Sequence, residues 1–563
     1  MVEYRNSHLH PRIRVRSLAS LSCAGQYSRE MCGVVGVKRD HWLCVAASLC
    51  ISLSLGYVAA LFVGRTTIKS LVIESPPPTE RSPISDVFRT PVDGNFYEIL
   101  DERPHIVFVL ADDLGYNDVG YGSLDLHACT PNLDAMWRDG VELTSLYAAP
   151  TCTPSRAALL TARYPTTLGM QHWQLEAAAP YGLDSSTATL GEVFQRQGYA
   201  TVFVGKWHLG HFSEAVLPTR RGFEKFYGFY TGGENYFTRV SEGACAPVNT
   251  SVPQVSEVGD IAKECFWDAI DNEAHEDLPA PEELHGKSHS TYAFAMRASD
   301  LVARHGSFSG GGLAQPILLV LALPNPHVPL LAPAAVFRTH DAILRQITNN
   351  QRRTFAALTI LWDEALGNVS AACNTHLPAR PILWVITSDN GAAVDGGGSN
   401  WPLRGGKKYL YEGGVKVRGL VYSASNILIP RARRGASYDG LMHLVDLLPT
   451  LLLGVLAASD DAGHGLVDID GIDHWTCLRD GLGNEPRDEV LLNIDYLDAD
   501  LEYLGYLRAA IISCTGTHSS GDSLVINSDA SSLPDLPLTG TTTCFKGLYN
   551  VEEVVAIYIP SSY

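Results

Sequence analysis

Four short, continuous apolar runs are prominent along the chain, at 106–111, 201–204, 317–323 and 382–387. Short apolar runs that alternate with helical segments predict buried strands of a mostly parallel sheet covered by helices on both faces. Each run ends in polar residues that a packed core would not favour. These endings are Asp112-Asp113, Gly205-Lys206-Trp207-His208, Pro324-Asn325-Pro326-His327 and Ser388-Asp389-Asn390-Gly391.

Helix signals lie between these runs. Thr130-Pro131-Asn132 begins a predicted helix that ends at Gly140, because it combines a cap residue, a proline in the first turn and a terminal glycine. A second helix is expected near 189–197, stopping at Gly198. Two more are expected at 355–366 and 441–453, the latter broken or restarted at Pro449.

The polar strand ends predict a metal site. In open α/β sheets, ligands bind beyond the carboxyl ends of the strands, so parallel neighbours would bring these ends to one cleft. Asp112, Asp113, Asp389 and Asn390 would then offer three carboxylates and one amide oxygen. Such hard donors suit Ca²⁺, or Mg²⁺ with more waters, rather than zinc. For the first acidic pair alone, a turn or helix cap is the alternative.

The segment Cys152-Thr153-Pro154-Ser155-Arg156 places a cysteine at the start of a predicted helix. Backbone N–H groups and the helix dipole favour an anion at that position. On this motif alone, a buried structural cysteine is an equal alternative. Five basic residues are candidates for holding an anion or moving protons, although each has an ordinary structural interpretation. They are Arg156, Lys206, His208, His327 and Lys407.

The charge balance limits the partners. The formal net charge of −19 argues against binding to nucleic acid, so any anionic substrate must be held by a local basic cluster. The hydrophobic content of 46% and charged content of 18% are typical of a globular protein rather than a disordered one.

The N-terminal region predicts membrane anchoring. Residues 42–64 carry no charge, a run of 23 residues, and seven Lys or Arg precede it. The positive-inside rule then predicts a cytosolic segment at 1–40 and a transmembrane signal anchor at 41–64, with the remainder lumenal or extracellular as a type II protein. A Pro-rich stalk would follow at 65–102. The alternative is a signal peptide that is cleaved to give a secreted or lysosomal protein.

Two asparagine sequons support a secretory compartment. Asn249 and Asn368 begin N-glycosylation sequons. Eight cysteines follow the predicted anchor; if Cys152 is modified, seven remain, and one thiol is expected to stay unpaired or to bridge to another chain. Cys245 and Cys265 are the most plausible local pair.

Taken together, these motifs resemble the sulfatase family from about residue 104 to 471. The resemblance runs through Ala111-Asp112-Asp113-Leu114-Gly115, the Cys152 segment, Gly205-Lys206-Trp207-His208-Leu209-Gly210, Pro326-His327-Val328-Pro329 and Ser388-Asp389-Asn390-Gly391. Within the family the chain is most similar to the arylsulfatase B, or N-acetylgalactosamine-4-sulfatase, group. The residues that indicate this group are Gly169-Met170-Gln171-His172, Leu217-Pro218-Thr219-Arg220-Arg221-Gly222-Phe223, Asn400-Trp401-Pro402-Leu403-Arg404-Gly405 and Glu412-Gly413-Gly414-Val415.

The resemblance implies an alkaline-phosphatase-like α/β sandwich at 103–470, with a large mixed, mostly parallel sheet between helices. A smaller C-terminal α+β domain with an antiparallel sheet is expected at 471–563, and the sequence suggests that it is truncated. The implied activity is sulfuric ester hydrolysis on a glycosaminoglycan of the N-acetylgalactosamine-4-sulfate type or on an aryl sulfate.

The resemblance also implies residue roles. Cys152 would be oxidised to formylglycine by a formylglycine-generating enzyme, and the hydrated aldehyde would be the nucleophile. One Ca²⁺ would be bound by the formylglycine oxygen at Cys152 and by Asp112, Asp113, Asp389 and Asn390. Arg156 and Lys206 would hold the hydrate and the sulfate, Lys407 and His327 would bind sulfate and assist the leaving group, and His208 would position or deprotonate the hydrate.

Two other functions remain open from the sequence. A phosphatase or phosphodiesterase of the same superfamily would use Ser or Thr and two zinc ions, which Cys152 and Asn390 do not favour. A non-catalytic membrane glycoprotein would be expected to have lost some of the polar positions. Gly406 and Lys408 depart from the group pattern, in which a basic and an aromatic residue are common, and this leaves the contacts to the sugar open.

Overall fold

The structure is a computed structural model of the 563-residue chain. It describes residues 103–239, 241, 270–272, 278–279, 289–307, 315–458, 466–483, 485–494, 509–515 and 543–549. The predicted anchor, the stalk, Asn249 and the Cys245–Cys265 pair lie outside these ranges and stay predictions. Within them, no helix combines the length and the apolar character needed to cross a bilayer.

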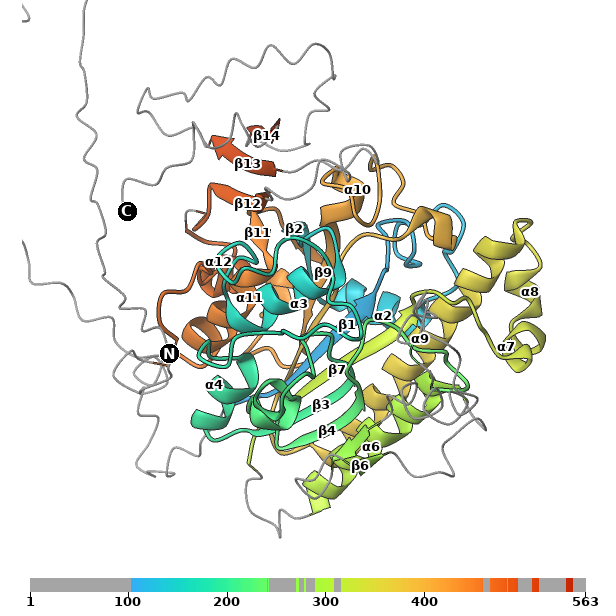
Figure 1. The fold of residues 1–563 in the computed structure, drawn as a ribbon, viewed down its shortest axis with the longest axis horizontal. Coiled ribbons are helices and arrows are strands. Elements are labelled where there is room, and N and C mark those ends of the chain that lie inside the picture. Colours follow the sequence, from blue (N-terminus) through green and yellow to red (C-terminus); the bar gives the residue numbers. More distant parts are fainter. Residues whose placement is uncertain are drawn as a thin grey trace, which may run out of the picture. The chain divides into compact units, whose positions relative to one another are not determined.

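A mixed sheet of eleven strands forms the centre of the compact unit Gly94–Ile557 (Figure 1). Its order is β10-β2-β9-β8-β1-β7-β3-β4-β5-β6, with β11 paired to β2. The four predicted strands are confirmed and are adjacent and parallel at its middle: β8 (Ile382–Ser388), β1 (His105–Asp112), β7 (Ile317–Pro326) and β3 (Ala200–Lys206). The others are β2 (Val141–Tyr147), β4 (Lys225–Phe229), β5 (Ile270–Asn272), β6 (Leu278–Pro279), β9 (Lys416–Tyr422), β10 (Ala436–Tyr438) and β11 (Met442–His443).

Both faces of the central strands are buried, which explains their continuous apolar sequences. Along β1, Ile106 and Phe108 belong to one apolar cluster, whereas Val107 and Val109 belong to another, as the two-residue period of a strand requires. The first cluster packs on α3 (Cys152–Thr161), α4 (Leu190–Arg196), α11 (Leu447–Pro449) and α12 (Trp475–Asp480). The second packs on α2 (Pro131–Asp139), α6 (Ser290–Ser307) and α9 (Asn350–His376).

The helix predictions are largely confirmed. α2 ends at Gly140, and α4 begins with a capping box between Thr189 and Glu192. α9 is longer than the predicted 355–366: its N-terminal extension begins at Asn350, and its C-terminal extension continues to bury Val369 and Cys373 against the core. Three short helices complete the set: α7 (Ala334–Thr339), α8 (Asp341–Leu344) and α10 (Glu412–Val415).

The predicted helix at 441–453 is wrong in its first part. Met442 and His443 pair with β2 instead, and a 3-10 turn, Leu444–Asp446, follows. Only then does the chain become helical, through α11 and a π-helical turn at Thr450–Val455. Strand pairing with a distant segment therefore overrides the local helical pattern.

A second, three-stranded sheet confirms the antiparallel sheet that was predicted for the C-terminal region. Its order is β12 (Glu489–Ile494), β13 (Ala509–Thr515) and β14 (Thr543–Tyr549). Val490 and Leu492 of β12 pack with Tyr147 and Val415 near the edge of the main sheet. The boundary between two domains at 470 stays a prediction.

Buried cysteines correct the expected thiol count. Cys129 and Cys373 are buried free thiols, so more than one cysteine besides Cys152 is unpaired. Burial raises the pKa of each to about 12. Each lies in an apolar cluster and acts there as a small hydrophobic side chain.

His105 on β1 predicts acid-sensitive stability. Its Nδ1 accepts the Ile317 N–H at 3.1 Å, and burial, aided by His305 and Arg380, lowers its pKa to about 3. Below about pH 6.5, the pKa of an unperturbed histidine, His105 is protonated in the unfolded chain but stays neutral in the folded chain. The free energy of unfolding therefore falls as the pH falls toward 3. We expect His105→Asn, which keeps an acceptor, to reduce this fall by about 1.4 kcal/mol per pH unit.

Denaturant unfolding of the wild type and this variant between pH 6.5 and 4.5 would measure the difference. His127→Asn, at an exposed histidine, is the control and should leave the wild-type pH slope unaltered. Equal slopes in the wild type and His105→Asn would contradict the prediction.

Candidate functional site

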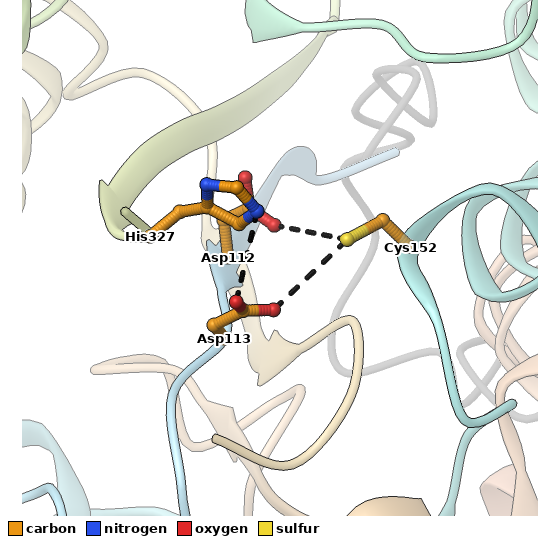
Figure 2. Close-up of side chains that lie close together, drawn as sticks. All are labelled: Asp112, Asp113, Cys152 and His327. Carbon is orange, nitrogen blue, oxygen red and sulfur yellow. Dashed lines mark hydrogen bonds and ion pairs between the residues drawn. The ribbon is translucent and has the colours of Figure 1, made fainter. Parts of the chain in front are cut away.

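The carboxyl ends of the central strands form one buried polar cluster. Asp112 and Asp113 come from the end of β1, and His327 follows β7 directly. Figure 2 shows the Asp112 and Asp113 side chains directed toward the sulfur of Cys152, at the first turn of α3, while the His327 ring lies against Asp113. One ligand atom from each of the four residues lies within 4.8 Å of the other three. The parallel register of the strands thus joins segments that are far apart in the sequence.

Cys152 is completely buried, and its environment does not favour a thiolate. Its Sγ lies 3.4 Å from Asp112 Oδ1 and 4.0 Å from Asp113 Oδ1. Burial, followed by the negative charge of Asp389, raises the pKa of the thiol far above its usual range, despite the nearby Lys206 and Lys407. A reactive cysteine requires a lowered pKa, so the unmodified thiol is a poor nucleophile here.

Three buried cations surround Cys152, and each contacts a carboxylate. Arg156, one turn along α3, donates from Nε and Nη2 to Asp389 Oδ2 at 3.1 and 2.9 Å. Lys206 Nζ donates to Asp112 Oδ2 at 2.7 Å. Lys407 Nζ lies 2.8 and 2.9 Å from the two oxygens of Asp113.

The cations and carboxylates set each other's protonation. Burial would raise the pKa of Asp112, but Lys206, His327 and Arg156 hold it well below its usual range. Burial and the neighbouring Asp112 raise the pKa of Asp389 to about 6. Burial opposes the charge of Lys407, but Asp113 raises its pKa above the usual lysine value. Three positive and three negative groups nearly cancel, so the cluster can accept a divalent cation together with an anion.

Two histidines lie at this cluster in neutral form. His208 Nε2 is 3.0 Å from the Leu175 carbonyl, which can only accept, so Nε2 carries the proton and Nδ1 has the free lone pair. That Nδ1 is buried without a hydrogen-bond partner among the described residues. Burial, then Lys206, lowers the pKa of His208 well below its usual value. Burial, then Lys407, lowers the pKa of His327 to about 4.

The donor atoms fit a hard metal ion. Asn390 Oδ1 is buried and has no hydrogen-bond partner in the described part of the chain, whereas its Nδ2 donates to Asp113 Oδ1 at 2.7 Å. A buried carbonyl oxygen without a donor requires an explanation, and a bound cation provides one. His327 joins the compact group of possible ligands, which the sequence did not indicate. Asp389 is not part of this compact group, but its Oδ1 accepts the Asp113 N–H at 3.3 Å.

The structure thus brings all ten predicted catalytic and metal residues to one site. Asn368 lies elsewhere, with an exposed side chain on α9. Sequence reasoning missed Thr153, whose Oγ1 donates to the His208 carbonyl at 3.1 Å and accepts the Leu175 N–H at 3.0 Å. Thr153 therefore fixes the backbone of His208 and the backbone of Leu175, whose carbonyl contacts the His208 ring. The only sequence feature that could have indicated Thr153 was its position next to Cys152.

Comparisons with known proteins agree with this geometry. The sulfatase family profile matches residues 104–453. The chain is 33% identical over 393 residues to arylsulfatase J of Mus musculus, covering 70% of this chain and 58% of that protein, so it spans less than two thirds of that relative. It is 30% identical over 411 residues to arylsulfatase A of Homo sapiens, covering 70% of this chain and 71% of that protein.

A structural relative supports the same fold. The crystal structure of Ps i-CgsB in complex with k-i-k-neocarrahexaose superimposes with a TM-score of 0.56 and 27% identity. The match covers 69% of this chain and 79% of that chain.

Proposed function

Since the chain belongs to the sulfatase family, we propose that it hydrolyses sulfate esters of a sulfated carbohydrate or an aryl sulfate, using a formylglycine derived from Cys152 and one Ca²⁺. The observation that carries this proposal is the set of three buried cations, Arg156, Lys206 and Lys407, around a buried cysteine at a helix start. A sulfate group needs such fixed positive charge in a water-excluded site.

Cys152 is suited to modification rather than to direct attack, because its raised pKa leaves the thiol protonated. When oxidised to formylglycine and hydrated, this position supplies two hydroxyl groups on one carbon, one to attack sulfur and one to release sulfate. A formylglycine-generating enzyme is the maturation partner that this proposal requires.

The surrounding side chains bind the anion and move protons. Arg156 and Lys206 converge on the Cys152 side from α3 and the end of β3, and hold the sulfate and the reacting oxygen. His208 Nδ1, the nitrogen with the free lone pair, accepts a proton at this position. Lys407 stays protonated and neutralises charge on the sulfate oxygens, while His327 lies on the same side to assist the leaving group.

Asp112, Asp113, Asp389 and Asn390, together with the oxygen at position 152, are the proposed Ca²⁺ ligands. Bound Ca²⁺ would neutralise the carboxylates and polarise the sulfate ester. The unpartnered Asn390 Oδ1 supports this set, and the amide does not favour the zinc pair of related phosphatases.

Turnover of 4-nitrophenyl sulfate and 4-nitrophenyl phosphate tests the function, with a peptide mass spectrum across Cys152. We expect sulfate release, little phosphate release, and an aldehyde at position 152. Preferred release of phosphate would favour the phosphatase alternative. A chain that carries the aldehyde but hydrolyses neither ester would favour the non-catalytic alternative.

The proposal also includes a natural substrate class and a cellular compartment. We assign the N-acetylgalactosamine-4-sulfate type of glycosaminoglycan, on the motifs shared with the arylsulfatase B group. One known relative is N-acetylgalactosamine-6-sulfatase of Homo sapiens, 28% identical over 380 residues, covering 65% of each chain. The type II anchor at 41–64 and glycans at Asn249 and Asn368 belong to the same proposal.

A further inference from the structure

Lys408 differs from the other cations of the site. Its neighbour Lys407 is 7% exposed and contacts Asp113. Lys408 is half-buried, and its backbone has a φ of +81°, a left-handed conformation that is unfavourable for a lysine. Its Nζ lies 5.8 Å from the centre of the Trp173 ring. The backbone therefore separates two consecutive lysines into two different environments.

Hydrogen bonds place Lys408 and Trp173 beside the reactive position. The Lys408 N–H donates to the Pro150 carbonyl at 2.7 Å, two residues before Cys152. Trp173 lies two residues before Leu175, whose N–H binds Thr153 and whose carbonyl contacts His208. Both side chains thus belong to segments fixed to the first turn of α3.

Lys408 also lacks a carboxylate partner. Arg156, Lys206 and Lys407 each contact an aspartate, but Lys408 forms no ion pair with any carboxylate in the described part of the chain. The Trp173 ring holds its ammonium by a cation–π contact, which leaves the positive charge uncompensated. In a chain of net charge −19, such a group beside an anion-binding site attracts a negatively charged ligand.

We propose that Lys408, held by Trp173, forms a second anion subsite that binds a further sulfate or carboxylate group of the substrate. This inference rests on the proposed function and narrows its substrate class to carbohydrates with at least two anionic groups. Lys407 would act on the ester that is cleaved, and Lys408 would bind the group that remains. A substrate with one anionic group would leave Lys408 unused.

The test compares N-acetylgalactosamine 4-sulfate with N-acetylgalactosamine 4,6-disulfate. In the wild type we expect kcat/KM for release of the first sulfate to be about tenfold higher for the disulfate, the size expected of one charge-assisted contact. Lys408→Gln should lower this ratio about tenfold, and Lys408→Arg should retain most of it. Arg404→Gln is the matched control, since Arg404 is an exposed cation of the same segment that stacks 4.1 Å over Tyr411.

An equal disulfate-to-monosulfate ratio of kcat/KM in the wild type and Lys408→Gln would overturn the subsite. An equal loss of that ratio in Arg404→Gln would also overturn it, because any positive charge near the site would then have the same effect. Calorimetric binding of both sugars separates this outcome from failure of the proposed function. If no ester is hydrolysed, the proposed function is wrong. The subsite is then supported if Lys408→Gln abolishes a wild-type binding preference for the disulfate, and it is overturned if the preference is absent or unchanged.

Discussion

Cys152→Ser is expected to lose sustained turnover of an aryl sulfate by at least about 10³-fold, a loss typical of removing a nucleophile. Serine keeps one oxygen at the position where Cys152 Sγ lies 3.4 Å from Asp112. It has no second hydroxyl on the same carbon, so it can take up a sulfuryl group but has no route to release it. We therefore expect at most one sulfate per chain.

Intact-protein mass after incubation with 4-nitrophenyl sulfate would measure this result, as a single stable adduct or no reaction. Cys373→Ala is the control, because Cys373 is an equally buried cysteine on α9, in the apolar cluster between that helix and the sheet. It should lose stability through the cavity it creates, yet retain turnover. Repeated turnover by Cys152→Ser would exclude the formylglycine mechanism and favour a phosphatase with a serine nucleophile.

The central architecture could be predicted because its cause lies in the local sequence. Strands such as β1 and β7 are buried on both faces, so their residues form continuous apolar runs. The chain can place charged groups only where it leaves that core, and the acidic residues therefore follow the strands directly. Parallel pairing of four such strands then suffices to bring their ends together.

The partner of each charged group could not be predicted, because it depends on distances between segments. Nothing local indicates that Arg156 binds Asp389 while Lys206 binds Asp112. The role of Gly205 is likewise tertiary: its φ is +114°, and an added Cβ would lie 1.9 Å from the Ala322 carbonyl oxygen of β7. Glycine at this position therefore lets β3 approach β7 directly before Lys206.

Substitutions of two proposed metal ligands, Asn390 and Asp389, should distinguish the stability that comes from bound calcium from the stability that comes from buried ion pairs. Asn390→Ala removes a buried oxygen that has no hydrogen-bond partner among the described residues, so we expect it to abolish the calcium-dependent rise in melting temperature. It also removes the hydrogen bond from Nδ2 to Asp113 Oδ1, so the metal-free protein should lose about 1–3 kcal/mol of stability. Asp389→Ala removes the closest carboxylate of buried Arg156. Removing one partner of a buried ion pair costs about 3–5 kcal/mol, and Asp112 Oδ1, 3.7 Å from Arg156 Nη2, replaces Asp389 only in part. This variant should therefore melt earlier both with and without calcium. Both variants should lose turnover.

Thermal unfolding of the wild type and both variants, in excess calcium and in chelator, would measure these effects. At a calcium concentration of about 100 times Kd, binding stabilises the folded wild type by about 2.7 kcal/mol. A wild-type melting temperature and activity that are indifferent to chelator would show that the cluster binds no metal. A normal calcium response in Asn390→Ala would instead remove only Asn390 from the ligand set. Because Asp389 contacts both Arg156 and the Asp113 backbone, only the comparison of the two variants distinguishes a metal ligand from a residue that positions the site.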